Sequence, residues 1–372
     1  MDLLVNGGLF VIFLLVLVLP FRVKQVEHNL EVFLFACGVV ALTLAGFMTL
    51  PGETTGWSTT IIEEALLAPL KITTVSGIPV GIVQIVLLVG LLLFWFHRRL
   101  EAAIVGMVDR FSLKAIVFSL IVVLGLISSI ISAILAAIIL VEIVNALPVV
   151  KKAKVEIAVV ACFSIGLGAG LTPLGEPLTT IVISKLSGTP YHAGFTFLFN
   201  NLAVYLIPAV IALGFVGVFL FSRSHTGDTK LECIIERESV RDIVLRAGKV
   251  YLFIMALIFL GEGFKPLILE YIISIPSAGL YWVNIVSAVL DNATLAAAEI
   301  GPALTLQQIV SALMGLLIAG GMLIPGNIPN IIAAGKLQIT SREWAEVGIP
   351  LGLVLMGIFF VLLFVPGWMG LA

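Results

Sequence analysis

Two acidic residues lie inside long apolar stretches of the sequence, where an isolated charge is energetically costly. Glu176 lies in the run Thr172-Pro173-Leu174-Gly175-Glu176-Pro177, and Asp291 precedes Asn292 within the apolar stretch 275–305. A carboxylate removed from water is tolerated when it is protonated, paired or bound to a cation. Because a proton and Na⁺ can compete for one carboxylate, these residues predict a site that binds cations and protons.

Proline and glycine flank Glu176 and predict an interrupted helix around it. Pro173 and Pro177 remove backbone hydrogen bonds and Gly175 permits non-helical torsions, which frees carbonyl oxygens for a cation. A second segment, Ile324-Pro325-Gly326-Asn327-Ile328-Pro329-Asn330, repeats the proline and glycine pattern with amides in place of the carboxylate. Both segments therefore offer neutral oxygen ligands.

The two segments belong to a longer internal repeat. Residues 170–186 align with residues 321–337 at an offset of 151, which places Glu176 opposite Asn327, and Ser132-Ala133 matches Ser287-Ala288 upstream. Each unit is predicted to contain a helix, a hairpin, a broken helix and a final helix. Repeats of opposite orientation with corresponding interruptions are typical of secondary transporters whose site lies between the repeats.

The composition of the chain places these residues in a membrane protein. Of 372 residues, 60% are hydrophobic and 11% charged, against about 45–50% and about 25% in soluble domains. The net charge of −2 gives no basic excess for a nucleic-acid partner. The three cysteines and four histidines form no ligand cluster, so no cofactor is predicted apart from Na⁺ and H⁺ as transported or coupling ions.

A membrane-spanning helix needs about 20 mostly apolar residues. The sequence predicts an all-α polytopic membrane protein with two inverted-topology repeats, each with a re-entrant hairpin and a broken transmembrane helix. Eight spans are predicted, at 3–20, 30–50, 78–96, 155–186, 195–221, 247–270, 307–337 and 347–366. The predicted regions are 1–77 (N-terminal helices and an external amphipathic segment), 78–221 (first repeat), 222–246 (cytoplasmic linker) and 247–366 (second repeat).

The distribution of Lys and Arg predicts the orientation. All of them except Lys71, Lys185 and Lys265 lie in the connections assigned to the cytoplasm, so both chain ends are predicted outside the cytoplasmic (inner) membrane. Residues 115–148 must then enter and leave on the same side, as two half-length helices with a tip at Gly125 to Ser132. Residues 275–305 are predicted to do so from outside, with a tip at Ser287 to Asn292. Non-helical backbone at this depth implies a solvated central site.

The candidate site residues fall into two groups. Glu142 and Glu299 lie on the returning arms of the hairpins, where a transport role and a position at the lipid headgroups are both open. The predicted cation- and proton-binding residues are Asp291, Glu176, Asn292, Asn327, Gly175, Gly326, Ser132, Ser287 and Thr172, with Na⁺ as the metal ion. A substrate or second cation site is predicted at Ser128, Ser129, Thr179, Asn330 and Glu142.

At these residues the chain resembles the ion transporter superfamily, and within it the NhaD-type sodium/proton antiporters. Residues 287–292, followed by Ala296-Ala297-Ala298, are similar to the Ser-Ala-x-x-Asp-Asn-Val-Pro segment of that family. Residues 172–176, with Thr179-Thr180, are similar to its Thr-Pro-Ile-Gly-Asp-Val-Thr-Thr. An uncharacterised prokaryotic family of putative cation transporters in the superfamily is the nearest resemblance. It implies a homodimer in membrane lipid, with a scaffold, a moving transport domain and elevator-like alternating access.

The chain departs from the family pattern at several positions. Ala136 and Ala137 stand where the first hairpin has an Asp-Asn pair, Glu176 replaces Asp, and Ala293-Thr294 replaces Val-Pro. Two functions stay open. The first is Na⁺/H⁺ antiport, and the alternative is Na⁺-coupled symport of a small organic or inorganic anion. A membrane enzyme is disfavoured because the apolar segments hold no catalytic set of side chains.

Overall fold

The structure is a computed structural model of the chain, and within the residues that it describes the protein is almost wholly helical. These residues are 2–23, 25–26, 29–48, 55–70, 73–75, 78–80, 83–84, 87–88, 91, 95, 111–224, 239–271, 275–290, 292–302 and 304–368.

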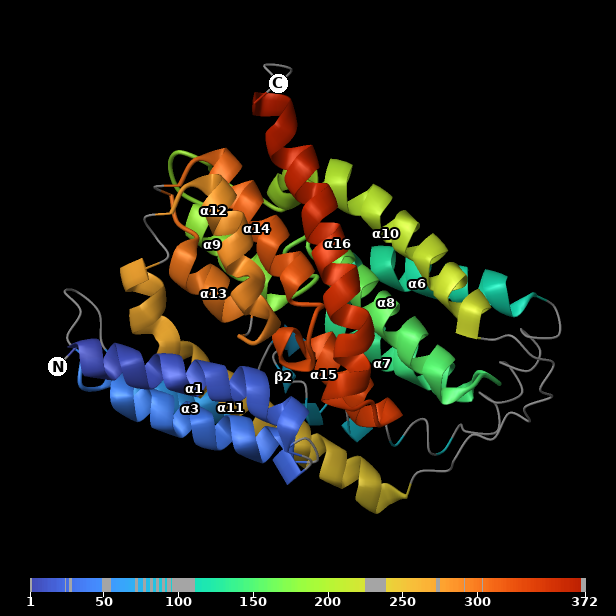
Figure 1. The fold of residues 1–372 in the computed structure, drawn as a ribbon, viewed down its shortest axis with the longest axis horizontal. Helices are drawn as coiled ribbons and strands as arrows, with labels where there is room; N and C mark the ends of the chain where they lie inside the picture. The colour runs from blue at the N-terminus through green and yellow to red at the C-terminus, as the bar shows by residue number, and fades with distance from the viewer. Residues whose placement is uncertain are drawn as a thin grey trace.

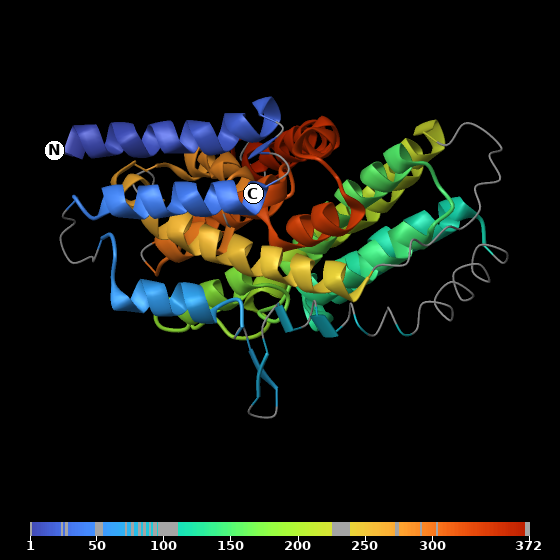
Figure 2. The ribbon, with the colours of Figure 1, turned by 90° about the horizontal axis from the view of Figure 1, so that it is seen from below.

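Three helices form a bundle along the lower left of Figure 1: α1 (Asp2–Arg22), α3 (Leu30–Ala45) and α11 (Val240–Tyr271). Glycines allow α3 and α11 to approach closely, since a Cβ on Gly38 would lie 2.8 Å from Phe259 Cβ. Lys249 of α11 pairs with Glu31 at 3.0 Å near the start of α3, so the two helices run parallel. The short helix α4 (Thr59–Leu67) packs on α11. Figure 2 shows α1, α3 and α11 next to one another from below.

A pair of short strands follows α4, where the sequence predicted only helix. Strands β1 (Thr73–Val75) and β2 (Ile78–Val80) pair antiparallel. The predicted span 78–96 is therefore wrong at its start. Both strands contain β-branched residues, and two residues, Ser76 and Gly77, separate them, which is a hairpin signal that an apolarity count overlooks.

The segment predicted as the first hairpin forms two helices, α6 (Leu113–Ile131) and α7 (Ala133–Ala146), separated by Ser132. Ser132 has a φ of 79°, and its Oγ accepts a hydrogen bond from Leu135 N at 3.4 Å, which caps α7. Helix α6 has 19 residues and is therefore about 28 Å long, so the prediction of two half-length helices is wrong for this arm.

The reason for this difference lies in two serines. Ser128 Oγ donates to Gly125 O at 2.6 Å and Ser129 Oγ to Leu126 O at 2.7 Å, one turn back in the same helix. These bonds satisfy the hydroxyl groups without opening the backbone. The helix therefore continues through the predicted tip and turns only at its last residue.

Helix α8 (Lys151–Ala169) and helix α9 (Pro177–Leu186) are separated at residues 170–176, which confirms the predicted interruption around Glu176. Contacts with α8 fix the direction of the hairpin arms. Ser164 of α8 donates to Ile121 O and Thr172 to Ser129 O, so α6 and α8 run parallel.

The second arm of this hairpin runs the other way. Ala133 N at the start of α7 donates to Gly175 O at 2.7 Å, beyond the end of α8. Lys154 Nζ near the start of α8 donates to Asn145 O at the end of α7. Because α7 is antiparallel to α8, α6 and α7 form an antiparallel pair.

The second half of the chain has the same order of elements. Helix α12 (Ser277–Val283) continues into the 3₁₀ turn η1 (Asn284–Ala288), and α13 (Asn292–Glu299) follows. The change of direction falls in the predicted tip 287–292. Helix α14 (Leu306–Ala319) is interrupted at 320–327, where η2 (Ile324–Gly326) lies, and α15 (Ile328–Leu337) completes the predicted broken helix.

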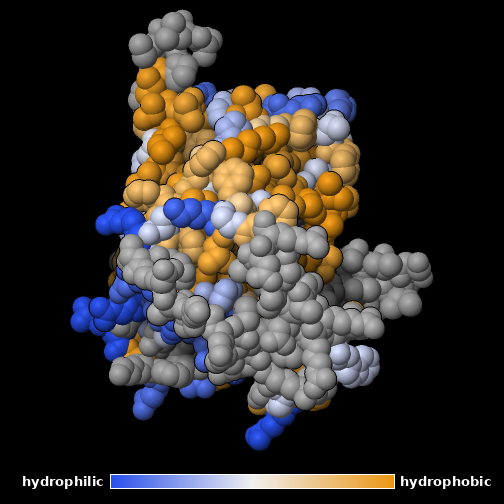
Figure 3. All heavy atoms as spheres, turned by 90° about the vertical axis from the view of Figure 1, so that its right-hand side faces the viewer, coloured by the Kyte–Doolittle hydropathy of each residue, from blue (hydrophilic) through white to orange (hydrophobic). Residues whose placement is uncertain are grey.

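Two helices of 28 residues each follow the broken helices: α10 (Phe197–Ser224) after α9, and α16 (Ser341–Trp368) after α15. Both expose large apolar side chains, such as Val204 at 70% and Val354 at 59%. Figure 3 shows a broad hydrophobic area on one face with hydrophilic side chains at its margins. Within the described chain, four helical stretches are long and apolar enough to cross a membrane: 113–131, 197–224, 243–267 and 341–365. They indicate a membrane protein.

Candidate functional site

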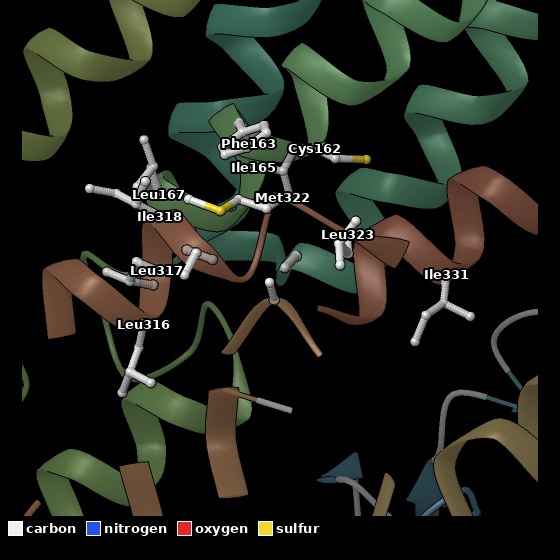
Figure 4. Packing of buried hydrophobic residues seen from close by; sticks show 14 of the residues in the cluster. Cys162, Phe163, Ile165, Leu167, Leu316, Leu317, Ile318, Met322, Leu323 and Ile331 are labelled. Atoms are coloured by element: carbon white, nitrogen blue, oxygen red, sulfur yellow. The ribbon is translucent and has the colours of Figure 1, made fainter. Parts of the chain in front are cut away.

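The two helix interruptions meet in the centre of the molecule. A Cβ on Gly321, in the second interruption, would lie 2.5 Å from Phe163 of α8, and one on Gly170 would lie 2.7 Å from Leu317 of α14. Helices α8 and α14 therefore meet at their carboxyl ends and run in opposite directions. Figure 4 shows the apolar side chains that fill this junction: Cys162, Phe163, Ile165 and Leu167 from α8, and Ile318, Met322 and Leu323 from the other half.

Glu176 is buried at this junction and contacts side chains from both parts of the second half. Its Oε2 accepts a hydrogen bond from Asn292 Nδ2 at 3.5 Å and from Asn327 Nδ2 at 3.4 Å. The three residues are 5%, 2% and 5% exposed. Of the predicted cation and proton ligands, the structure thus brings together one from the first interruption, one from the second hairpin and one from the second interruption.

The amino ends of three helices converge on the Glu176 carboxylate. Glu176 directly precedes α9, Asn292 is the first residue of α13, and Asn327 is the N-cap of α15. The first turn of a helix carries a partial positive charge, which favours a negative group. Each of these helices has eight or more residues. These helix ends therefore direct partial positive charge toward Glu176.

Backbone carbonyl groups surround the same junction, because α8 and α14 end there. Asn330 Nδ2 donates to Gly320 O at 2.7 Å and to Leu323 O at 2.8 Å, which fixes the second interruption. Glycine is required at both interruptions, since a Cβ on Gly175 would lie 2.0 Å from Ala169 O and one on Gly326 2.5 Å from Gly320 O. The chain thus combines one carboxylate, two amides and carbonyl dipoles within a closely packed core.

Several predicted site residues have structural partners. Thr179 Oγ1 donates to Glu176 O at 2.7 Å within the first turn of α9. Ser287 Oγ donates to Leu316 O at 3.3 Å and so joins η1 to α14. Thr172 joins the first interruption to the end of α6, and Ser132 caps α7. These four residues shape the site through hydrogen bonds to backbone groups.

Of the two serines predicted for a substrate site, Ser128 joins α6 to α8, whereas the Ser129 hydroxyl bonds within α6. Ser128 Oγ donates to Ile165 O at 2.9 Å in addition to its bond within α6, and Ser164 Oγ donates back to Ile121 O at 2.8 Å. A Cβ on Gly168 would lie 1.7 Å from Gly125 O, so the two backbones touch. Small residues and hydroxyl groups are the usual means of close helix packing in membranes.

Glu142 forms an ion pair that sequence reasoning missed. Its Oε1 lies 3.1 Å from Lys336 Nζ of α15, and the two side chains are 14% and 7% exposed. The pair joins α7 of the first half to α15 of the second. The sequence identifies Lys336 only as a basic residue at the end of a helix, because no sequence pattern relates it to Glu142. Asp291 lies outside the described residues.

We expect this buried ion pair to contribute strongly to stability. Replacing Lys336 with Met leaves the Glu142 carboxylate without its cation, and breaking a buried pair in this way costs about 3–5 kcal/mol. The double variant Glu142→Gln/Lys336→Met removes both charges and should recover most of that loss. Thermal unfolding of the detergent-solubilised variants measures the effect. Losses that simply add in the double variant would show that the two charges do not interact.

Comparison with known proteins places the chain in a family without assigning an activity. A family described as "Protein of unknown function (DUF1646)" matches residues 6–366. No curated protein matches the chain.

Proposed function

The chain belongs to the DUF1646 family of proteins of unknown function, and we propose that it is a secondary active transporter, a Na⁺/H⁺ antiporter that works by elevator-like alternating access. The observation that carries this proposal is the position of Glu176. A buried carboxylate, bonded to amides from the other half of the chain, lies where two interrupted helices meet. Such a group binds either a proton or Na⁺, and this competition couples their movements.

The relative directions of the helices support two repeats of inverted topology. In the first half α6 and α8 run parallel, and in the second half Asn284 and Ser287 bond to Ala312 O and Leu316 O, so α12–η1 and α14 also run parallel. The opposite directions of α8 and α14 support an opposite orientation of the two units. The cross-contacts are reciprocal, since α15 packs on α7 and α9 packs on α13.

This arrangement assigns roles to the two parts of each repeat. We assign the pairs α6–α7 and α12–α13, together with the broken helices, to a transport unit around Glu176. The bundle of α1, α3 and α11 is then the scaffold, and two copies of the chain form the transporter. Na⁺ enters bound to the ionised Glu176, and a proton takes the place of Na⁺ on the return step. One of the two cations therefore neutralises the carboxylate whenever it lies at membrane depth.

The arrangement of helix ends also supports a second candidate function, Na⁺-coupled anion symport. The side-chain amides of Asn292 and Asn327, together with the amino ends of α13 and α15, are suited to hold a small carboxylate or inorganic anion. In that case Glu176 would bind only the coupling cation. Ser128 and Ser129, which the sequence suggests for a substrate site, are less suitable for this anion, because their hydroxyl groups donate to backbone carbonyl oxygens.

The experiment that tests the proposal uses purified protein in liposomes with an internal pH dye and a clamped membrane potential. Adding Na⁺ outside should make the lumen alkaline, because each entering Na⁺ expels protons. Li⁺ and K⁺ serve as comparison cations. An unchanged internal pH with every cation would overturn antiport, and Na⁺-dependent uptake of a labelled anion would then identify the symporter.

The sequence also predicts an essential role for Asp291. Replacing Asp291 with Asn removes a titratable charge while keeping the shape of the side chain, so Na⁺-driven proton movement should be lost without loss of folded protein. Flux in liposomes and the elution profile on a sizing column measure the two properties. Full activity of this variant would exclude Asp291 from the transport cycle.

A further inference from the structure

Glu299 is a second buried carboxyl group, separate from the site around Glu176. It is the last residue of α13 and is 6% exposed. Asn292, which contacts Glu176, lies seven residues earlier, about 10 Å along the helix axis. The sequence left open a position at the lipid headgroups for Glu299, and the structure instead places its side chain in the protein interior.

The hydrogen bonds of Asn284 define how Glu299 is held. Asn284 Nδ2 donates to Glu299 Oε1 at 3.0 Å and to Ala312 O at 3.2 Å, and the residue is 1% exposed. Since a carbonyl oxygen can only accept, the amide must present its N–H groups to both partners. Glu299 Oε1 is therefore an acceptor, and any proton on the carboxyl group resides on Oε2.

Glu299 Oε2 is also buried, and no hydrogen-bond partner for it is found among the described residues. Helix α13 packs against α9, α11 and α14, and α14 carries no charged residue. Lys185 of α9 is exposed, and Glu262 and Lys265 of α11 pair with each other at 3.8 Å. The remaining described titratable groups of α11 are Arg241, which is exposed, Lys249, paired with Glu31, and Tyr251, bonded to Leu66 O.

Within the described chain Glu299 thus has one amide donor and no cationic partner, in contrast to Glu142 on the other hairpin, which pairs with Lys336. A carboxylate left in this state would carry a large desolvation cost, which a bound proton removes. Asn284 then donates one hydrogen bond to the neutral acid and one to Ala312 O.

We propose that Glu299 is a second proton-carrying residue, which holds a proton on Oε2 in this conformation and releases it when α13 moves relative to η1 and α14. The inference rests on the proposed function and adds a proton site to the same transporter. One proton binds and leaves per carboxyl group, with no other reactant. Glu176 remains the residue at which Na⁺ and a proton compete.

Infrared difference spectroscopy tests this inference on the full chain in lipid without relying on transport. A pH step in the absence of Na⁺ should produce a carboxylic-acid C=O band that disappears in Glu299→Gln. The band should persist in the control Glu156→Gln, whose buried carboxylate in α8 accepts a bond from Ser224 Oγ at 2.6 Å. An unchanged band in Glu299→Gln would overturn the proposal, and so would its removal by Na⁺ at constant pH.

Flux measurements supply the second readout. In liposomes Glu299→Gln should lower the ratio of protons to Na⁺ by one per cycle, whereas Glu156→Gln should keep the wild-type ratio. An unchanged ratio in Glu299→Gln contradicts a transported proton on this residue. If the wild-type protein shows no exchange at all, the proposed antiport fails, and the infrared band still decides whether Glu299 carries a proton.

Discussion

Replacing Glu176 with Gln should reduce Na⁺-driven proton movement to the level of protein-free liposomes. The substitution keeps the size of the side chain and its contacts with Asn292 and Asn327, but it removes the group that binds Na⁺ or a proton. Because no other group in the cluster of these three residues can ionise, the loss should be complete. Glu176→Asp keeps the carboxylate and should retain part of the activity.

The folded protein should tolerate this change, which separates loss of function from loss of structure. Gln removes a buried charge, so the melting temperature without Na⁺ should stay the same or rise. The wild-type protein should gain stability when Na⁺ is added, by about 2.7 kcal/mol at a concentration 100 times the dissociation constant, and Glu176→Gln should not. The control Glu156→Gln should keep both Na⁺ stabilisation and flux. A Glu176→Gln protein with wild-type exchange would remove Glu176 from the mechanism.

The elements around Glu176 could be predicted from sequence because their signals are local. Closely spaced proline and glycine residues favour the end of a helix, so both interruptions could be located within a few residues, whereas a single proline such as Pro208 lies inside the continuous helix α10. The repeat then indicated that the two segments should meet. What it could not indicate was the set of partners, because the bonds from Glu176 to Asn292 and Asn327 depend on packing between distant parts of the chain.

Several sequence-based expectations share one weakness, which is that a residue type is interpreted without its partner. Ser128 and Ser129 suggested an open tip, yet their hydroxyl groups bond to the preceding turn and keep α6 helical. Glu142 suggested a cation ligand, and the structure supplies Lys336 as its partner. Glu299, on the second helix of the other hairpin, has a neutral partner, so two residues of one type acquire different chemistry.

The contact between α6 and α8 gives the largest expected effect on folding. Replacing Gly168 with Ala places a methyl group 1.7 Å from Gly125 O. No side-chain rotation can relieve this clash, because the Cβ position and the carbonyl oxygen are both fixed by the backbone. The helices must separate, which also weakens the bonds from Ser128 to Ile165 O and from Ser164 to Ile121 O. We expect a loss of more than about 3 kcal/mol, the upper end for one added methyl group in a packed interior.

Gly357→Ala in α16 is the matched control, because a Cβ there meets no atom within 4 Å. It changes glycine to alanine in another long apolar helix, so its melting temperature should equal or exceed that of the wild-type protein. Thermal unfolding in detergent and the yield of monodisperse protein measure both variants. Since Thr172 joins the end of α6 to the interruption before Glu176, any Gly168→Ala protein that folds should also have weaker Na⁺ stabilisation. Wild-type stability and Na⁺ response in Gly168→Ala would show that α6 and α8 do not touch at these glycines, and that the first hairpin does not position Glu176.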